Sequence, residues 1–165
     1  MKQLETNDAI VRLLGVIFLK KQNLPDWAIA ALEYGFDSRS LRMLASMNDR
    51  DSASELHDYL NRAMIELGWN DLSRPKLLLR YSQFIAVEII EDKVDPLIAS
   101  RVIYEILVDL DSPWELMDWY EIDEMIWCHE YFIKTGEKDY YFRERDELVL
   151  EIKTAAAKLA QESLA

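Results

Sequence analysis

The sequence predicts an all-α protein, folded as an irregular multi-helix bundle of about eight or nine helices. Half of its 165 residues are hydrophobic, and only four glycines and four prolines interrupt them, which disfavours both disorder and a turn-rich β-fold. Apolar residues recur three and four positions apart, and helix-capping residues separate these runs. The length suits one hydrophobic core, so we expect a single helical domain over residues 1–165.

Four helices are expected in the first half of the chain. Their starts are polar residues that can accept hydrogen bonds from first-turn amides, or a proline, whose fixed φ suits the first turn. Glycine marks two of the stops, because it adopts the left-handed conformation that ends many helices. The expected helices run from Thr6 or Asn7 to Lys21, from Pro25 to Gly35, from Asp37 or Ser38 to Met47, and from a capping box at Ser52 and Glu55 to Gly68.

Four more helices are expected in the second half, by the same signals. Apolar residues of the helix that follows Asp95 lie on more than one face, which makes it a candidate for a central helix. The helix that follows Ser112 has a possible break near Glu121. The expected helices run from Ser73 to Glu91, from Asp95 to Leu110, from a capping box at Ser112 and Glu115 to Lys134 with a stop at Gly136, and from an Asp139 cap to the C-terminus.

Negative charge is concentrated in one part of the chain. The formal net charge is −12, and residues 88–130 contain thirteen acidic residues against two basic ones. Residues 1–82, by contrast, contain eleven of each sign. Nucleic acids and anionic membranes are bound by clustered Lys and Arg, so neither is expected as a partner. A basic protein partner fits this distribution better.

The acidic segment also holds three of the five tryptophans. We interpret Trp114 and Trp127 as core residues, because large apolar side chains are usually buried, and leave Trp119 open between core and surface. An exposed aromatic pair among carboxylates would have the composition of an interface hot spot. The candidate partner-binding residues are Asp118, Trp119, Tyr120, Glu121, Asp123 and Glu124.

No stretch of the sequence specifies a reaction. Carboxylate pairs occur on helices, but a di-metal bundle needs Glu-x-x-His, and Ile126 stands three residues before His129. Cys128 is next to His129, and adjacent helical residues do not face each other, so we interpret this cysteine as structural. Glycine is too scarce for a phosphate-binding loop. We therefore expect a protein that is not an enzyme, with no catalytic residue, no cofactor and no metal.

The sequence also predicts a cytoplasmic protein. Its N-terminus has no basic start followed by an apolar core, as a signal peptide would. No apolar run approaches the roughly 20 residues that span a bilayer. Cys128 is the single cysteine, which excludes an internal disulfide and suits a reducing compartment.

The stretch from Leu24 to Ala45, LPDWAIAALEYGFDSRSLRMLA, resembles a stretch in small helical bacterial proteins. Some of these resemble immunity proteins of polymorphic-toxin and contact-dependent growth inhibition systems. The resemblance extends through Glu66-Leu67-Gly68 and the Asp95-Pro96 helix start. It implies a bacterial helical protein for which toxin neutralisation is a plausible role, and it carries over no binding residue.

Three hypotheses follow. The leading one is an immunity or inhibitor protein that neutralises a basic partner, with a toxin nuclease domain as the favoured partner, through an acidic aromatic face. The alternative is a non-catalytic subunit or adaptor in a bacterial assembly. An enzyme with a carboxylate metal site is the third. The oligomeric state is left open.

Overall fold

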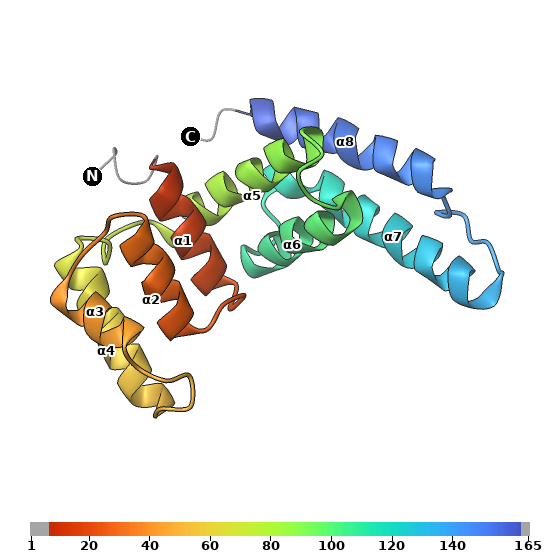
Figure 1. Cartoon of the computed structure of the whole chain (residues 1–165). Helices are drawn as coiled ribbons and strands as arrows, with labels where there is room; N and C mark the ends of the chain where they lie inside the picture. The colour runs from red at the N-terminus through yellow and green to blue at the C-terminus, as the bar shows by residue number, and fades with distance from the viewer. Residues whose placement is uncertain (1–6, 163–165) are drawn as a thin grey trace. The chain divides into compact units, whose positions relative to one another are not determined.

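The computed structural model describes residues 7–162, which form eight α-helices and one short 3₁₀ helix and contain no strand (Figure 1). This confirms the predicted all-α class. The chain divides into two compact units between Leu78 and Leu79, which we call unit 1 and unit 2. The expectation of one folding domain over residues 1–165 stays a prediction. Within the described range, every helix is too short or too polar to cross a membrane.

Unit 1 contains four helices whose starts are set by local capping. The side chain of Asn7 accepts hydrogen bonds from the amides of Ala9 and Ile10, and Ser38 accepts one from Leu41, as the sequence predicts. Asn23, which the sequence analysis passed over, caps the second helix. The predicted capping box at Ser52 is wrong, since this side chain makes no capping bond although a helix begins after it. The helices are α1 (Asp8–Phe18), α2 (Leu24–Glu33), α3 (Arg39–Ala45) and α4 (Ala53–Glu66).

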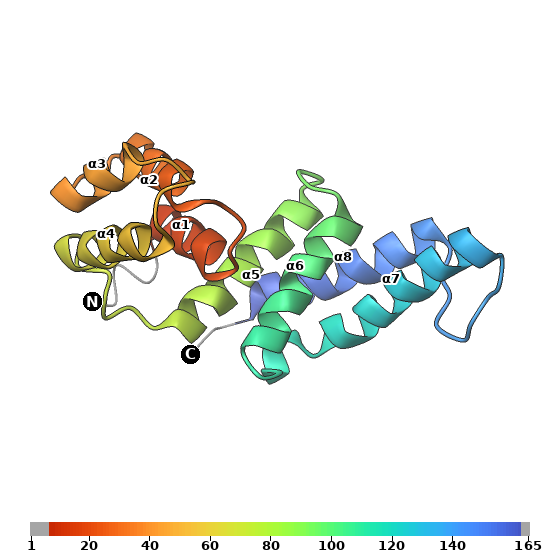
Figure 2. The ribbon, with the colours of Figure 1, turned by 90° about the horizontal axis from the view of Figure 1, so that it is seen from below.

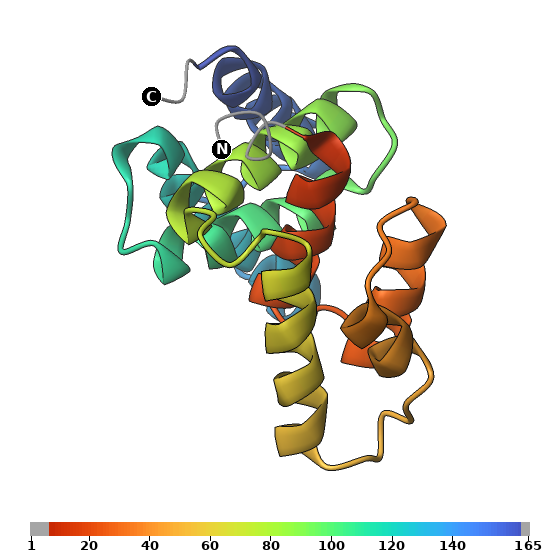
Figure 3. The same cartoon turned by 90° about the vertical axis from the view of Figure 1, so that its left-hand side faces the viewer.

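The core of unit 1 surrounds Trp27, which is fully buried. Helix α2 contacts α1, α3 and α4, and the segment that joins α3 to α4 lies at the lower end of Figure 3. The indole nitrogen of Trp27 donates a hydrogen bond of 2.9 Å to the carbonyl of Leu13. The rings of Trp27 and Phe36 both meet Trp69 edge to face. These contacts join α1 and α2 to the loop that follows α2 and to the turn after Gly68.

Helix α3 is held at its start by a carboxylate from α4. Glu66 accepts hydrogen bonds from the amide of Ser40 at 2.9 Å and from its hydroxyl at 2.7 Å. The hydrogen bond from the backbone amide of Ser40 is the main reason that the pKa of Glu66 lies below its ordinary value. Hydrogen bonds from the hydroxyls of Ser40 and Ser38 lower this pKa further. An ionised Glu66 therefore accepts hydrogen bonds from the first turn of α3, which is far from it in sequence.

Unit 2 contains most of α5 and everything that follows. Helices α7 and α8 run side by side in opposite directions (Figure 2), and α6 contacts both of them. The helix expected to be central thus contacts both of these neighbours, but its apolar residues are not all covered, since Ile98 and Val108 are exposed. The elements are α5 (Arg74–Ile90), α6 (Pro96–Asp109), the 3₁₀ helix η1 (Trp114–Leu116), α7 (Asp118–Thr135) and α8 (Arg145–Gln161).

Two predicted helix starts in unit 2 are wrong. Ser112 has a φ of +60° and precedes the 3₁₀ turn η1, so α7 begins only at Asp118, and the break lies before Asp118 and not near Glu121. Asp139 forms a turn with Phe142, and α8 begins after Glu144, which makes a reciprocal capping box with Glu147. The predicted N-cap at Asp95 is confirmed. The predicted stop at Gly136 is confirmed as well, and this glycine has a φ of +75°.

A buried glutamine connects α5 to the end of α8. The side-chain nitrogen of Gln83 donates to the carbonyls of Leu159 at 3.0 Å and Glu162 at 2.8 Å. Leu159 lies in the last turn of α8, where its carbonyl also accepts from the amide of Glu162 at 3.3 Å, and Glu162 is the residue that follows the helix. Arg80 donates to the oxygen of the Gln83 side-chain amide at 2.9 Å, which fixes its orientation. Gln83 therefore fastens the C-terminal end of α8.

Candidate partner-binding surface

Of the three tryptophans in the acidic segment, the two that we interpreted as core residues are exposed, and the one that we left open is buried. Trp119 is 1% exposed and belongs to the core, so it does not supply the partner contact expected of it. The interpretation of Trp114 and Trp127 as core residues is wrong, because they are 72% and 53% exposed. The buried face of α7 is formed by Trp119, Ile122, Met125, Ile126, Cys128 and His129. At 3.6 residues per turn, Trp127 falls on the opposite side of the helix.

Three aromatic residues at helical spacing lie on the side of α7 opposite its buried face, and we call them the aromatic stripe: Tyr120, Trp127 and Tyr131. Tyr120 is 58% exposed, and its ring contacts Tyr104 of α6 at a centroid distance of 6.4 Å. The rings of Trp127 and Tyr131 lie face to face, with centroids 5.2 Å apart and planes 12° apart. The stripe thus presents large apolar rings where a partner can reach them.

Several carboxylates of the acidic segment are already paired with cations of the chain itself. Asp118, a predicted contact residue, is 2.7 Å from the ammonium group of Lys158. Glu130 is 2.6 Å from the guanidinium group of Arg101. Similar pairs occupy Glu91, Asp92 and Asp95. These groups contribute less to the field outside the protein than the formal charge of the segment indicates.

Glu121 and Glu124 are the carboxylates that stay available beside the aromatic stripe. Both are exposed, and within residues 7–162 neither has an ion-pair or hydrogen-bond partner. Asp123 is half-buried, and its pKa is raised mainly by burial, with Arg101 opposing the shift and Glu124 and Glu130 adding to it. The negative charge on this side of α7 is therefore carried mainly by two exposed glutamates.

A shallow hollow lies next to these glutamates. It is lined by Tyr120, Glu121, Glu124 and Tyr141, the last of which comes from the loop between α7 and α8. A second hollow, between α7 and α8, includes Asp118, Glu121, Met125 and Lys158 among its lining residues. Sequence reasoning missed Tyr141, since it lies 20 positions from Glu121 and only the return of the loop brings the two together.

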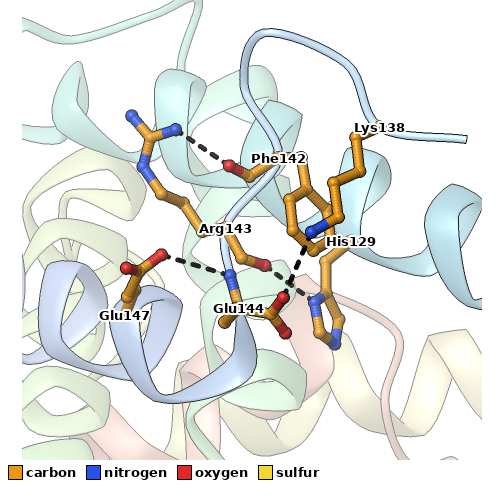
Figure 4. A network of polar contacts seen from close by, with 6 residues as sticks. All are labelled: His129, Lys138, Phe142, Arg143, Glu144 and Glu147. Carbon is orange, nitrogen blue, oxygen red and sulfur yellow. Dashed lines mark hydrogen bonds and ion pairs between the residues drawn. The ribbon is translucent and has the colours of Figure 1, made fainter.

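The loop that carries Tyr141 is held in place by His129 (Figure 4). The Nδ1 atom of His129 lies 2.9 Å from the carbonyl oxygen of Arg143, and its ring stacks on Phe142 at 6.1 Å. The ammonium group of Lys138 lies 4.6 Å from the centre of the Phe142 ring and pairs with Glu144 at 3.4 Å. The contacts of His129 with Arg143 and Phe142 thus hold the loop that carries Tyr141 against α7.

The described residues include no group of three or more His, Cys, Asp or Glu side chains arranged to hold a metal ion. Cys128 is buried, and burial raises the pKa of its thiol. His57 is exposed and lines a separate, largely apolar hollow in unit 1 together with Phe18, Leu60 and Met64.

No protein-family model matches the chain. No curated protein is significantly similar to it. The same is true of the solved structures. The resemblance of the Leu24–Ala45 stretch to immunity proteins stays a prediction.

Proposed function

We propose that the chain is an immunity or inhibitor protein that binds and neutralises a basic protein, with a toxin nuclease domain as the favoured partner. The observation that carries the proposal is the aromatic stripe of α7 beside two exposed glutamates that the chain's own cations leave unpaired. The contact residues are Tyr120, Glu121, Glu124, Trp127, Tyr131 and Tyr141. Trp127 and Tyr131 take the place of the buried Trp119.

Aromatic rings and carboxylates have separate tasks on such a surface. Tyr and Trp bury a large apolar area with little loss of side-chain entropy, and they dominate the binding energy of many interfaces. Exposed carboxylates attract a cationic partner and speed the encounter. A nuclease suits this arrangement because its active site must itself attract phosphates with Lys and Arg.

The proposal places the protein in the cytoplasm, where an immunity protein meets a toxin that enters or is made in the cell. Its net charge of −12 disfavours nucleic acids and anionic membranes as direct partners. A second candidate function, a non-catalytic subunit or adaptor, is favoured by the exposed apolar residues Ile98 and Val108 of α6. Binding through such residues would depend little on salt.

The test first asks whether a reading frame next to this chain's gene encodes a large protein. The C-terminal domain of such a protein is then expressed alone and together with the chain. We expect the chain to restore cell growth and to block nuclease activity of the purified domain. The double variant Glu121→Lys/Glu124→Lys should lower the association rate about ten-fold at low salt and flatten its salt dependence.

The matched control is Glu55→Lys/Asp58→Lys on α4 of unit 1. It changes the net charge by the same amount, at two exposed carboxylates that are also three residues apart. We expect its association rate to stay within about two-fold of the unmodified chain. Equal effects of the two double variants would place the binding site elsewhere, and binding of the unmodified chain that is insensitive to salt would support the adaptor function.

A further inference from the structure

The stacked pair Trp127 and Tyr131 leaves one face of the indole ring uncovered. Tyr131 comes from the turn that follows Trp127, and the two rings are nearly parallel at 5.2 Å, close to the rise of one helical turn. Trp127 remains 53% exposed although it stacks on Tyr131. Glu124 lies three residues before Trp127, on the same side of the helix.

The pair is fixed before any partner arrives. The hydroxyl of Tyr131 donates a hydrogen bond of 3.0 Å to the carboxylate of Glu137, which lies just beyond the end of α7. This bond holds the phenol ring against the indole and limits its rotation. Trp127 is 53% exposed, but its ring is held by the stacked phenol of Tyr131. Binding of a ligand therefore costs less conformational entropy than it would at a freely rotating side chain.

An uncovered indole face beside a carboxylate matches the chemistry of a guanidinium group. Guanidinium is planar and weakly hydrated, so it can stack on an aromatic ring and still donate two parallel hydrogen bonds to a carboxylate. An ammonium group is a strongly hydrated point charge and cannot do both equally well.

The chain already uses such contacts with its own cations. Arg80 lies over the ring of Phe84 at 5.1 Å, and Arg62 lies over Tyr59 at 5.5 Å. In the part of the chain that the structure describes, no cation lies over Trp127. Its free face is open to a cation supplied by another molecule.

We propose that Trp127, supported by Tyr131, and Glu124 form a binding site for one arginine side chain of the partner, with arginine preferred to lysine. The inference rests on the proposed function in one respect, that the partner is a basic protein. It goes beyond the proposed function by requiring that the partner present an exposed arginine to Trp127.

The test titrates the full chain with capped tri-arginine and tri-lysine peptides and follows the tryptophan indole N–H resonances by NMR. The resonance of Trp127, assigned with Trp127→Phe, should shift with tri-arginine, whereas that of the exposed Trp114 should not. We expect tri-arginine to bind about two- to five-fold more tightly than tri-lysine, the range expected of a cation–π contact at an exposed site. Glu124→Gln should remove most of this preference.

Trp127→Leu is compared with Trp114→Leu, which removes an even more exposed indole from the same unit, and circular dichroism checks that both variants fold. The proposal expects loss of the arginine preference in the first variant only. Equal affinity for the two peptides, or a shift of Trp114 as large as that of Trp127, would overturn the arginine site. The acidic surface could still bind the toxin domain in that case, because the rate and salt dependence of that binding are measured separately.

Discussion

Replacement of Gln83 by methionine tests whether a single buried amide fastens the end of α8. Methionine keeps nearly the same length and removes both hydrogen-bond donors. The carbonyl of Leu159 lies in a buried contact and would keep only the 3.3 Å hydrogen bond from the amide of Glu162, at a cost of about 1–2 kcal/mol. The carbonyl of Glu162 is only partly buried, so water can replace part of its bond, and its loss adds about 0.5–1 kcal/mol.

The expected decrease in the free energy of unfolding is therefore about 1.5–3 kcal/mol. For a chain of 165 residues this corresponds to a decrease in Tm of about 3–12 °C. Urea denaturation followed by circular dichroism measures the change. The control is Gln161→Met, which replaces an exposed glutamine at the end of α8 and should have an effect within about 0.5 kcal/mol. A Gln83 variant as stable as this control would refute the assignment of Gln83 as a fastening residue.

Two further predictions concern unit 1. Trp27→Phe should lower the free energy of unfolding by about 2–3 kcal/mol, because it removes two buried ring carbons and the hydrogen bond to Leu13, whereas Trp114→Phe should have almost no effect in the same urea titration. Glu66 has a lowered pKa in the folded state, so its contribution to stability is present above the ordinary carboxyl pKa and is lost as the pH falls through the lowered value. As the pH is lowered through this range, the melting temperature of Glu66→Gln should fall less steeply than that of the unmodified chain. Parallel plots of melting temperature against pH would contradict the assignment of Glu66 as an ionised hydrogen-bond acceptor for α3.

The helix starts that the sequence predicted correctly depend on neighbouring residues. Asn7, Ser38 and Asp95 each bond to an amide two or three residues away, so the motif and the bond are both visible in the sequence. Ser112 and Asp139 have the same residue types, but the chain around them turns instead of continuing as a helix. A suitable residue type is therefore necessary for an N-cap, but the cap forms only where the backbone that follows is helical.

The composition of the candidate surface could be predicted, but its geometry could not. Tyr120, Glu121 and Glu124 follow from the mixture of aromatic and acidic residues in α7. The exchange of roles between Trp119 and Trp127 depends on which side of α7 packs against α6 and α8, and both tryptophans occur in similar sequence surroundings. The pairing of Asp118 with Lys158 joins residues 40 positions apart, so no local pattern reveals that this carboxylate is neutralised.

The division between Leu78 and Leu79 falls within α5, and this limits how the acidic half could be produced alone. A fragment that begins at Leu79 would lack the first turn of that helix, and the first four amides of the remainder would lose their carbonyl acceptors. Gln83, which orients the end of α8, would then sit in a fraying first turn. A fragment that begins at Ser73 keeps the natural start of α5 and is the better design for crystallisation or peptide binding.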